Sequence, residues 1–303
     1  MDRSTAEKNE ALSRDIQREA YRLRLVEDMV STKVRYFQLG RPTKGDHAAL
    51  NRVHERALEN VATLRNRSLP TSLAPAGGAI GLHYSAVEVV AYDPGWPLLF
   101  KAESEAIGQR LHPLEAAIHH VGSTSIPGMP AKPLIDMAIS VDPAALQARL
   151  PDYISAMEAL GYRFFGDFGH RGGYYFSKLS GGVQTFTAQF HASDSWDLKR
   201  LLGFRDAARA DPSLFSEYSE VKIALASALG RNRGIYYWYK GHWLNDRLLT
   251  ERGPTAWGTW FLLAQYPTMF RMGVRHVLSI IRPRFTGKGL HPMAIRRRKR
   301  VGA

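Results

Sequence analysis

One stretch of the chain, residues 120–141, holds the residue types and spacing that suit chemistry on a phosphate group. It begins at His120, passes through the small-residue turn Gly122-Ser123-Thr124, and ends in an apolar run that surrounds Asp136. A bounded apolar run with β-branched residues is typical of a buried strand. An acid in such a strand needs a partner, a metal or a shifted pKa. A turn that holds phosphate oxygens, followed by a carboxylate that holds Mg²⁺, is the arrangement a nucleotide site requires.

The other polar residues of this stretch have both a functional and a structural interpretation. Ser123 and Thr124 could donate hydrogen bonds to phosphate, or they could cap the next turn. Lys132 could pair with phosphate or form an ion pair within its own loop. His120 and the later His191 could act as metal ligands or general bases, because neutral imidazole does both. A lone histidine on a strand also commonly satisfies a local hydrogen bond.

Helical segments nearer the C-terminus carry basic and tyrosine side chains that could close over an anionic ligand. Arg205, Lys222, Tyr236 and Lys240 fall on three predicted helices, at spacings that favour one face turned towards a sheet edge. Surface ion pairs explain the same residues about as well.

The overall charge favours anionic partners. The net charge is +13 and the pI is near 10.0, which indicates attraction to nucleotides, nucleic acid or acidic lipids. Ten basic residues and no acid lie between Arg271 and the end of the chain, so most of the excess is in this tail. The absence of cysteine excludes disulfides and thiolate sites. Because residues 1–8 include no apolar signal segment, we expect a cytoplasmic location.

Hydrophobic periodicity predicts an α+β fold with a mixed sheet flanked by helices. Two amphipathic helices with a break at Gly40 to Gly45 form a predicted N-terminal hairpin, and each has one apolar stripe. These stripes must pack on the body of the protein or on a second copy, which makes a homodimer one alternative. Predicted strands and helices then follow in the residue ranges 87–92, 98–111, 117–121, 134–139, 142–160, 161–165, 173–178, 185–191, 195–209, 211–229 and 235–251.

The C-terminal tail is aromatic and then strongly basic. The uncharged run 255–270 is short for a membrane-spanning helix, which needs about 20 residues. Its aromatic residues, followed by an arginine-rich apolar segment, are typical of a helix that lies on an anionic membrane surface. The alternative is an apolar face packed on the domain beside a solvated basic end. Nucleic acid is a less favoured partner, because no recognised nucleic-acid fold accompanies the basic run.

Six motifs, in order, give the chain a resemblance to a known family. The pattern resembles that of the GrpB family over roughly residues 85–250, through Tyr92-Asp-Pro-Gly-Trp-Pro, His120-Val-Gly-Ser-Thr, Lys132-Pro-Leu-Ile-Asp136, Leu202-Gly-Phe-Arg-Asp206, Tyr218-x-x-x-Lys222 and Tyr236-x-x-x-Lys240. The resemblance implies a nucleotidyltransferase-like fold. We therefore divide the chain into a helical hairpin and linker (1–80), a GrpB-like domain (81–253) and a basic amphipathic helical tail (254–303).

The resemblance also implies a set of site residues. Asp136, His191 and His120 would be catalytic, and Asp136 would hold Mg²⁺. The nucleotide, ATP or another nucleoside triphosphate, would be bound by Gly122, Ser123, Thr124, Lys132, Arg205, Tyr236 and Lys240. Two-metal members of the wider superfamily carry a second acid on the same strand, where this sequence has Ala138. Gln189 likewise stands where the GrpB pattern tends towards histidine.

Two functional hypotheses follow from these residues. The first is an enzyme that transfers a nucleotidyl or related group to a small-molecule acceptor, or activates that acceptor for ligation. The second is a catalytically reduced module that binds a nucleotide or another anion, or serves in assembly, with the tail attached to a membrane surface. The missing second acid at Ala138 favours the second hypothesis.

Overall fold

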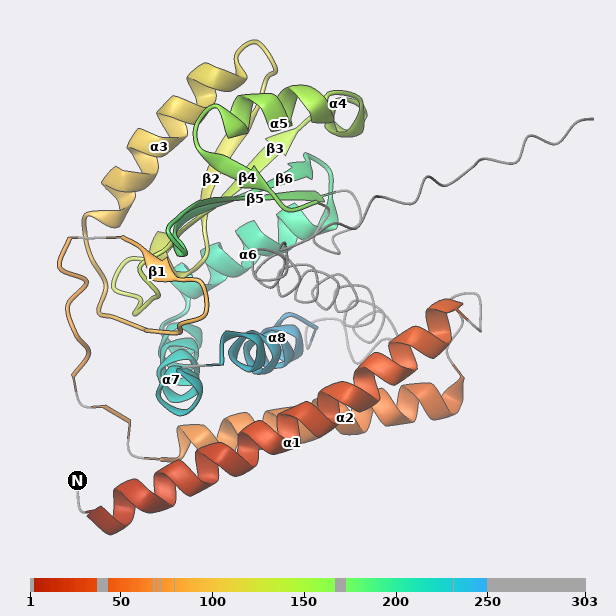
Figure 1. The fold of residues 1–303 in the computed structure, drawn as a ribbon, viewed down its shortest axis with the longest axis vertical. Helices are drawn as coiled ribbons and strands as arrows, with labels where there is room; N and C mark the ends of the chain where they lie inside the picture. Colours follow the sequence, from red (N-terminus) through yellow and green to blue (C-terminus); the bar gives the residue numbers. More distant parts are fainter. Residues whose placement is uncertain are drawn as a thin grey trace, which may run out of the picture.

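A mixed sheet lies between two groups of helices, and a long helical hairpin lies along one side (Figure 1). The computed structural model describes residues 3–36, 43–67, 69–70, 72–78, 80–166, 173–230 and 232–249. The tail 254–303, for which a membrane-surface helix is predicted, lies outside the described residues. No helix among the described ranges is both long and apolar enough to cross a membrane.

Six strands make one sheet in the order β2-β3-β6-β5-β4, with β1 attached to β6. The β3–β6 pair is parallel and the other pairs are antiparallel, so the sheet is mixed, as the α+β prediction requires. The strands are β1 (Leu82–His83), β2 (Ala117–Val121), β3 (Ile135–Val141), β4 (Tyr162–Phe164), β5 (Gly173–Ser180) and β6 (Val183–Ala192).

One face of the sheet forms one of the two large apolar cores of the protein. Alternate residues of β3, namely Ile135, Met137 and Ile139, are fully buried on this face, as the period-two geometry of a strand dictates. The helices that contribute to this core are α3 (Trp96–Leu111), α4 (Pro143–Ala148) and α5 (Leu150–Glu158). One helix was predicted over 142–160; it is divided because Pro151 cannot donate to the preceding turn.

The opposite face of the sheet is only partly covered by α6 (Trp196–Ala210). Leu198 of α6 packs on Val121 and Ala138. Asp136, two residues before Ala138, lies on this same face. Thr187 lies beside it as its register partner in the β3–β6 pairing. The chain continues into α7 (Pro212–Leu229) and α8 (Arg233–Leu249), which lie between the sheet and the hairpin (Figure 1).

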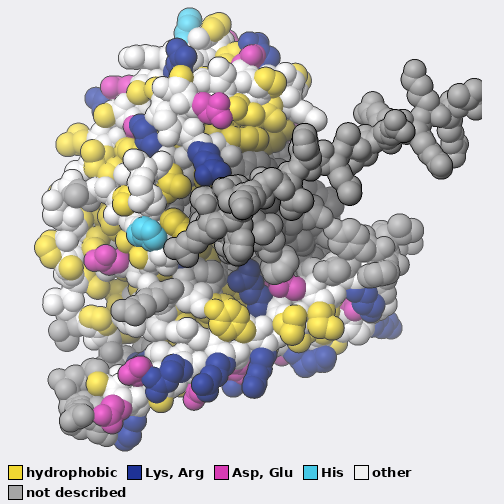
Figure 2. Space-filling model, viewed as in Figure 1, with side chains coloured by type: hydrophobic (Ala, Val, Ile, Leu, Met, Phe, Trp, Pro, Cys, Tyr) yellow, Lys and Arg dark blue, Asp and Glu magenta, His cyan; other side chains and the backbone are white. Residues whose placement is uncertain are grey.

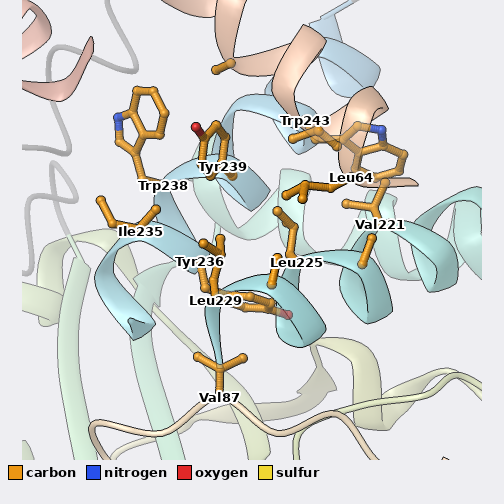
Figure 3. Packing of buried hydrophobic residues seen from close by; sticks show 14 of the residues in the cluster. Leu64, Val87, Val221, Leu225, Leu229, Ile235, Tyr236, Trp238, Tyr239 and Trp243 are labelled. Atoms are coloured by element: carbon orange, nitrogen blue, oxygen red, sulfur yellow. The ribbon is translucent and has the colours of Figure 1, made fainter. Parts of the chain in front are cut away.

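The N-terminal hairpin consists of α1 (Arg3–Tyr36) and α2 (Lys44–Arg65). Its apolar stripes pack on α7 and α8 in a second large cluster, which includes Leu64 of α2 together with Leu225, Tyr239 and Trp243 (Figure 3). The sequence required a partner surface for these stripes, and the body of the protein provides it.

A buried carboxyl group also joins α1 to α8. Glu27 of α1 is fully buried, and its Oε2 accepts a hydrogen bond of 2.6 Å from Trp238 Nε1. Burial, with a smaller contribution from Asp28, raises the pKa of Glu27 to about 8. Glu27 is therefore held as a neutral acid below that pH.

The strand predicted at 87–92 is wrong, because this segment connects two cores instead of joining the sheet. Val87 packs in the helical cluster, and its N–H donates to the Gly230 carbonyl at 2.9 Å. Val90 packs in the sheet core and makes an isolated bridge with Ala131. The alternating valines therefore reflect burial on two different sides, without a neighbouring strand.

Candidate functional site

Asp136 is held between the turn after β2 and the neighbouring strand β6. Its Oδ1 accepts a hydrogen bond of 2.5 Å from Thr187 Oγ1. On the other side, Gly122 has a φ of 69°, and a Cβ at this position would stand 2.6 Å from Asp136 Oδ2. Only glycine tolerates both this backbone conformation and this approach. The structure thus brings together the turn and the acid that the sequence placed fourteen residues apart.

A lysine and an arginine meet at one phenol group close to Asp136. Lys132 Nζ donates to the Tyr237 oxygen and lies 4.1 Å from the centroid of that ring. Arg233, one helical turn before Tyr237 on α8, donates from Nη2 to the same oxygen at 3.0 Å. The guanidinium is fixed by two further acceptors, Gln184 Oε1 at 2.6 Å and the Tyr84 carbonyl at 2.9 Å.

Two more lysines complete this group from α7 and α8. Lys222 is only 2 % exposed, its Nζ donates to the Pro130 carbonyl, and it lies 4.8 Å from the Tyr218 ring centroid. Burial, then the positive charges of Lys240 and Lys132, lower the pKa of Lys222 well below its ordinary value. Lys240 Nζ lies 5.2 Å from the centroid of the Tyr237 ring.

We call Lys132, Lys222, Arg233 and Lys240 the cationic cluster. Burial lowers the pKa of Lys132, and the charges of Arg233 and Lys240 lower it further, so these groups repel one another. Among the residues that the structure describes, Asp136 is the carboxylate whose charge reaches the cluster. Four basic side chains thus face one carboxylate. Buried charges are costly unless they are paired, so this imbalance makes the cluster a candidate site for an anion.

The predicted site residues of the turn divide between two environments. Ser123 Oγ lies 3.4 Å from the hydroxyl of Tyr218, which places it beside the cationic cluster. Thr124 is buried, and its hydroxyl contacts His120 Nε2 at 3.0 Å and the Leu134 carbonyl at 3.4 Å. Ser123 is therefore placed to meet a ligand, whereas Thr124 stabilises the turn.

His120 lies on the opposite face of the sheet from Asp136. It is the register partner of Met137 in the β2–β3 pairing, and its ring stacks on Phe100 of α3 with centroids 4.5 Å apart. Burial, then the charges of Arg209 and Arg205, lower the pKa of His120 to about 4. The structure does not bring this neutral histidine to the carboxylate.

His191 shares the face of Asp136 but lies farther along the sheet. It is paired with Ser140 in the β3–β6 register, four residues beyond Thr187. At about 3.3 Å per residue, that separation is roughly 13 Å along β6. His191 is therefore not near Asp136. Its side chain is also only 1 % exposed, so it is not open to a ligand.

The two remaining predicted binding residues lie at the margins of the site. Arg205 donates from Nη1 to the His120 carbonyl at 3.1 Å and forms an ion pair with Asp206. Tyr236 points into the apolar cluster of α7 and α8 (Figure 3), and its ring centroid lies 5.7 Å from Lys132 Nζ. Arg205 thus holds the end of β2 next to the turn. Tyr236 lies on the apolar side of the cationic cluster.

Sequence reasoning missed Arg233, Tyr237 and Thr187. Arg233 and Tyr237 precede Lys240 by seven and three residues, and this helical spacing could have placed all three on one face of α8. Thr187 carries no such signal, because its proximity to Asp136 depends on the pairing of strands distant in sequence.

The protein donors around Asp136 do not by themselves fit a dedicated metal centre. In the described part of the chain, no group of three or more histidine or acidic side chains could hold an ion. Asp136 instead accepts a hydrogen bond from the Thr187 hydroxyl, and its charge acts on the Tyr237 phenol and on Arg233 and Lys240. A Mg²⁺ ion would fit here only in the company of phosphate oxygens, which prefer this metal and would offset the surrounding positive charge.

Fold and site together define an α+β protein with a mixed sheet, one face of which carries an acid beside a cationic cluster. The sequence model described as "GrpB protein" matches residues 86–249. The chain therefore belongs to the GrpB family, which confirms the resemblance stated from its motifs. The matched segment contains the Asp136 strand and all four members of the cationic cluster.

The chain is also similar to curated relatives and to a solved structure. The chain is 35 % identical to the UPF0157 protein YqkA of Bacillus subtilis, across 52 % of this chain and 45 % of the relative. It is 36 % identical to a UPF0157 protein of Pseudomonas aeruginosa, across 50 % of this chain and 61 % of the relative. It thus spans about half the length of these relatives. A crystal structure of conserved protein GrpB from Enterococcus faecalis matches with 26 % identity and a TM-score of 0.46, covering 59 % of this chain and 98 % of that one.

Proposed function

We propose that this protein binds a nucleoside triphosphate, such as ATP, through its phosphate groups at the cationic cluster. The observation that carries the proposal is an imbalance of ionisable groups, in which four buried or half-buried basic side chains face the single carboxylate of Asp136 in the described structure. A polyphosphate supplies the missing negative charge. Lysine and arginine are the side chains that bind phosphate oxygens best, through charge-assisted hydrogen bonds.

The cluster offers a phosphate chain donors from several elements. Lys132 comes from the loop before β3, Lys222 from α7, and Arg233 and Lys240 from α8. Ser123 and the backbone of the turn at Gly122 border the same space. Such convergence of donors from separate elements favours one orientation of a bound ligand.

A second candidate function is transfer of a nucleotidyl or related group to a small-molecule acceptor. The position of Asp136 favours it, since a carboxylate close to bound phosphates can ligate a Mg²⁺ ion that accompanies the nucleotide. The acceptor oxygen would form a bond to phosphorus, the bond to the leaving pyrophosphate would break, and the acceptor proton would pass to solvent water. With one acid in place, the cationic cluster would supply most of the charge stabilisation.

Calorimetric titration with ATP, CTP and inorganic triphosphate, each with and without Mg²⁺, tests the binding proposal. We expect Lys240→Met to weaken binding about tenfold, the loss typical of one charge-assisted hydrogen bond. The matched control is Lys101→Met, because Lys101 is exposed on α3 and only 4.0 Å from Glu105 in an ion pair. No binding by the wild-type protein, or equal effects of the two variants, would refute the proposal.

A separate assay tests the transfer reaction. Purified protein is incubated with ATP, Mg²⁺ and pools of candidate acceptors, and release of pyrophosphate is measured. Turnover that is lost in Asp136→Asn supports transfer. Tight nucleotide binding without turnover in any pool favours the catalytically reduced binding module.

A further inference from the structure

One phenol oxygen in the cationic cluster accepts two hydrogen bonds from positively charged donors. Lys132 Nζ and Arg233 Nη2 both donate to the Tyr237 oxygen. An ammonium and a guanidinium have no acceptor atoms, so the oxygen must accept both bonds. Lys240 Nζ and the Arg233 guanidinium also lie 5.2 and 5.3 Å from the Tyr237 ring centroid. Tyr237 thus occupies the position that a phosphate oxygen would take.

The charged and titratable groups around Tyr237 come from several elements, and most of them favour a negative oxygen. Burial alone would raise the pKa of the phenol, but the charges of Lys132, Arg233 and Lys240 outweigh it and lower the pKa to about 7. Asp136 of β3 acts in the other direction. The neighbouring phenols, Tyr175 of β5 and Tyr236 of α8, keep their protons because burial, and with it the charge of Tyr237, raises their pKa.

We propose that the Tyr237 phenolate is the internal counter-ion of the cationic cluster, and that an incoming phosphate group displaces it from Lys132 and Arg233 while it takes up one proton. This inference rests on the proposed function for its second half. No covalent bond to the ligand forms: the phosphate oxygens take over the two donated hydrogen bonds, and the phenolate oxygen gains a proton from solvent. The empty cluster keeps its charge partly neutralised by its own side chain.

Such an exchange couples ligand affinity to pH. Above about pH 7, each phosphate that binds must be accompanied by protonation of Tyr237, so the affinity of the wild-type protein falls by up to about tenfold per pH unit. A phosphate group with a second pKa of about 6 is already about nine-tenths ionised at pH 7, and more so above it. The pH dependence of the affinity therefore comes mainly from a group of the protein and not from the ligand.

The first part of the test needs no ligand. The near-ultraviolet absorbance of tyrosinate is followed as pH rises, and we expect one tyrosine to ionise near pH 7 in the wild-type protein and none there in Tyr237→Phe. Tyr174→Phe is the matched control, since Tyr174 lies on the opposite face of the sheet, in register with Phe190 of the apolar core. Lys132→Met removes one cation and should move the titration towards the ordinary tyrosine value of about 10. A titration unchanged in Tyr237→Phe and in Lys132→Met would overturn the inference.

The second part adds inorganic triphosphate at a pH above 7. We expect the tyrosinate absorbance of the wild-type protein to fall as ligand binds, and Tyr237→Phe to bind more tightly than the wild type. Binding detected by calorimetry without any fall in absorbance would overturn the displacement while leaving the proposed function intact. If triphosphate, ATP and CTP all fail to bind, the proposed function and the displacement fail together. The Tyr237-specific titration would then establish the counter-ion alone.

Discussion

A Cβ on Gly122 would stand 2.6 Å from Oδ2 of Asp136. The residue after β2 can therefore lie against the acid of β3 only because it has no side chain. The left-handed backbone at Gly122 aims the following turn away from the strand. Asp136 is then closed in by Thr187 on the other side, at 2.5 Å. The acid therefore has a fixed orientation towards the cationic cluster.

Gly122→Ala should destabilise the protein and displace Asp136. The positive φ costs an alanine roughly 1 kcal/mol, and the close contact adds to this, so we expect a loss of about 2 kcal/mol or more in the free energy of unfolding. Urea denaturation measures it. Gly203→Ala is the control, because Gly203 lies within α6 with open space around its Cα, where alanine should be stabilising. Equal stability of the Gly122 variant and the wild type would contradict the expectation.

Asp136→Asn should have opposite effects on two ligands. Removing the single acid close to the cluster should strengthen the binding of inorganic triphosphate without Mg²⁺ by roughly fivefold, equivalent to about 1 kcal/mol of relieved repulsion. The same change should abolish any gain in ATP affinity that Mg²⁺ gives the wild type. Calorimetry of both ligands tests this.

The control for that comparison is Asp152→Asn. Asp152 forms an exposed ion pair with Arg149 on the far side of the sheet core, and its loss should leave both affinities unchanged. If Asp136→Asn retains the full effect of Mg²⁺, Asp136 is not a ligand of the metal.

The elements of the fold were predictable where the signal was local. Three elements could be predicted from a few neighbouring residues. These are the strand around Asp136, the alternating strand β6, and α7, which begins with a proline. The segment at 87–92 did not, because its valines alternate for a reason that depends on two separate cores. A periodic pattern of apolar residues predicts that they are buried, but it does not show which part of the protein buries them.

The site was predictable only in part, for the same physical reason. Gly122, Ser123 and Lys132 are tied to Asp136 through a short connection, and sequence proximity brought them together. On α8, the motif ending at Lys240 drew attention to Tyr236, which points into the apolar cluster. Its neighbour Tyr237, about 100° around the helix, faces the cations instead. Choosing between adjacent residues of a helix requires knowing which face meets the sheet.

Glu27→Gln should make the protein less sensitive to rising pH. The pKa of Glu27 is raised from 4.5 to about 8 by burial, so the unfolded state releases its proton first as pH increases. Stability from this group is full below about pH 4.5 and is lost progressively up to about pH 8. One pKa unit corresponds to about 1.4 kcal/mol, so the variant should exceed the wild type by a few kcal/mol at pH 8 and match it in acid.

Glu19→Gln is the control with the opposite sign. Its carboxylate accepts from Arg56 Nε at 2.7 Å and from Asn60 Nδ2 at 2.8 Å, and these bonds outweigh burial and lower the pKa of Glu19. Its stabilisation is present above the ordinary pKa and is lost as pH falls, so Glu19→Gln should weaken the protein at neutral pH. Denaturation of both variants across pH gives the two slopes, and parallel slopes would contradict the assignment.

Leu25→Glu should separate any dimer formed through the hairpin. Tyr21, Leu25 and Met29 recur every four residues on α1 and are each more than half exposed. Figure 2 shows apolar side chains between basic ones along this part of the surface. Pairing with the same face of a second copy would bury this stripe, and a charge at its centre would oppose that burial. Light scattering coupled to gel filtration should therefore show a dimer for the wild type, a monomer for Leu25→Glu, and an unchanged dimer for Leu98→Glu, whose side chain is exposed on α3 far from the hairpin. A monomeric wild type at all accessible concentrations would leave the stripe without a self-association role.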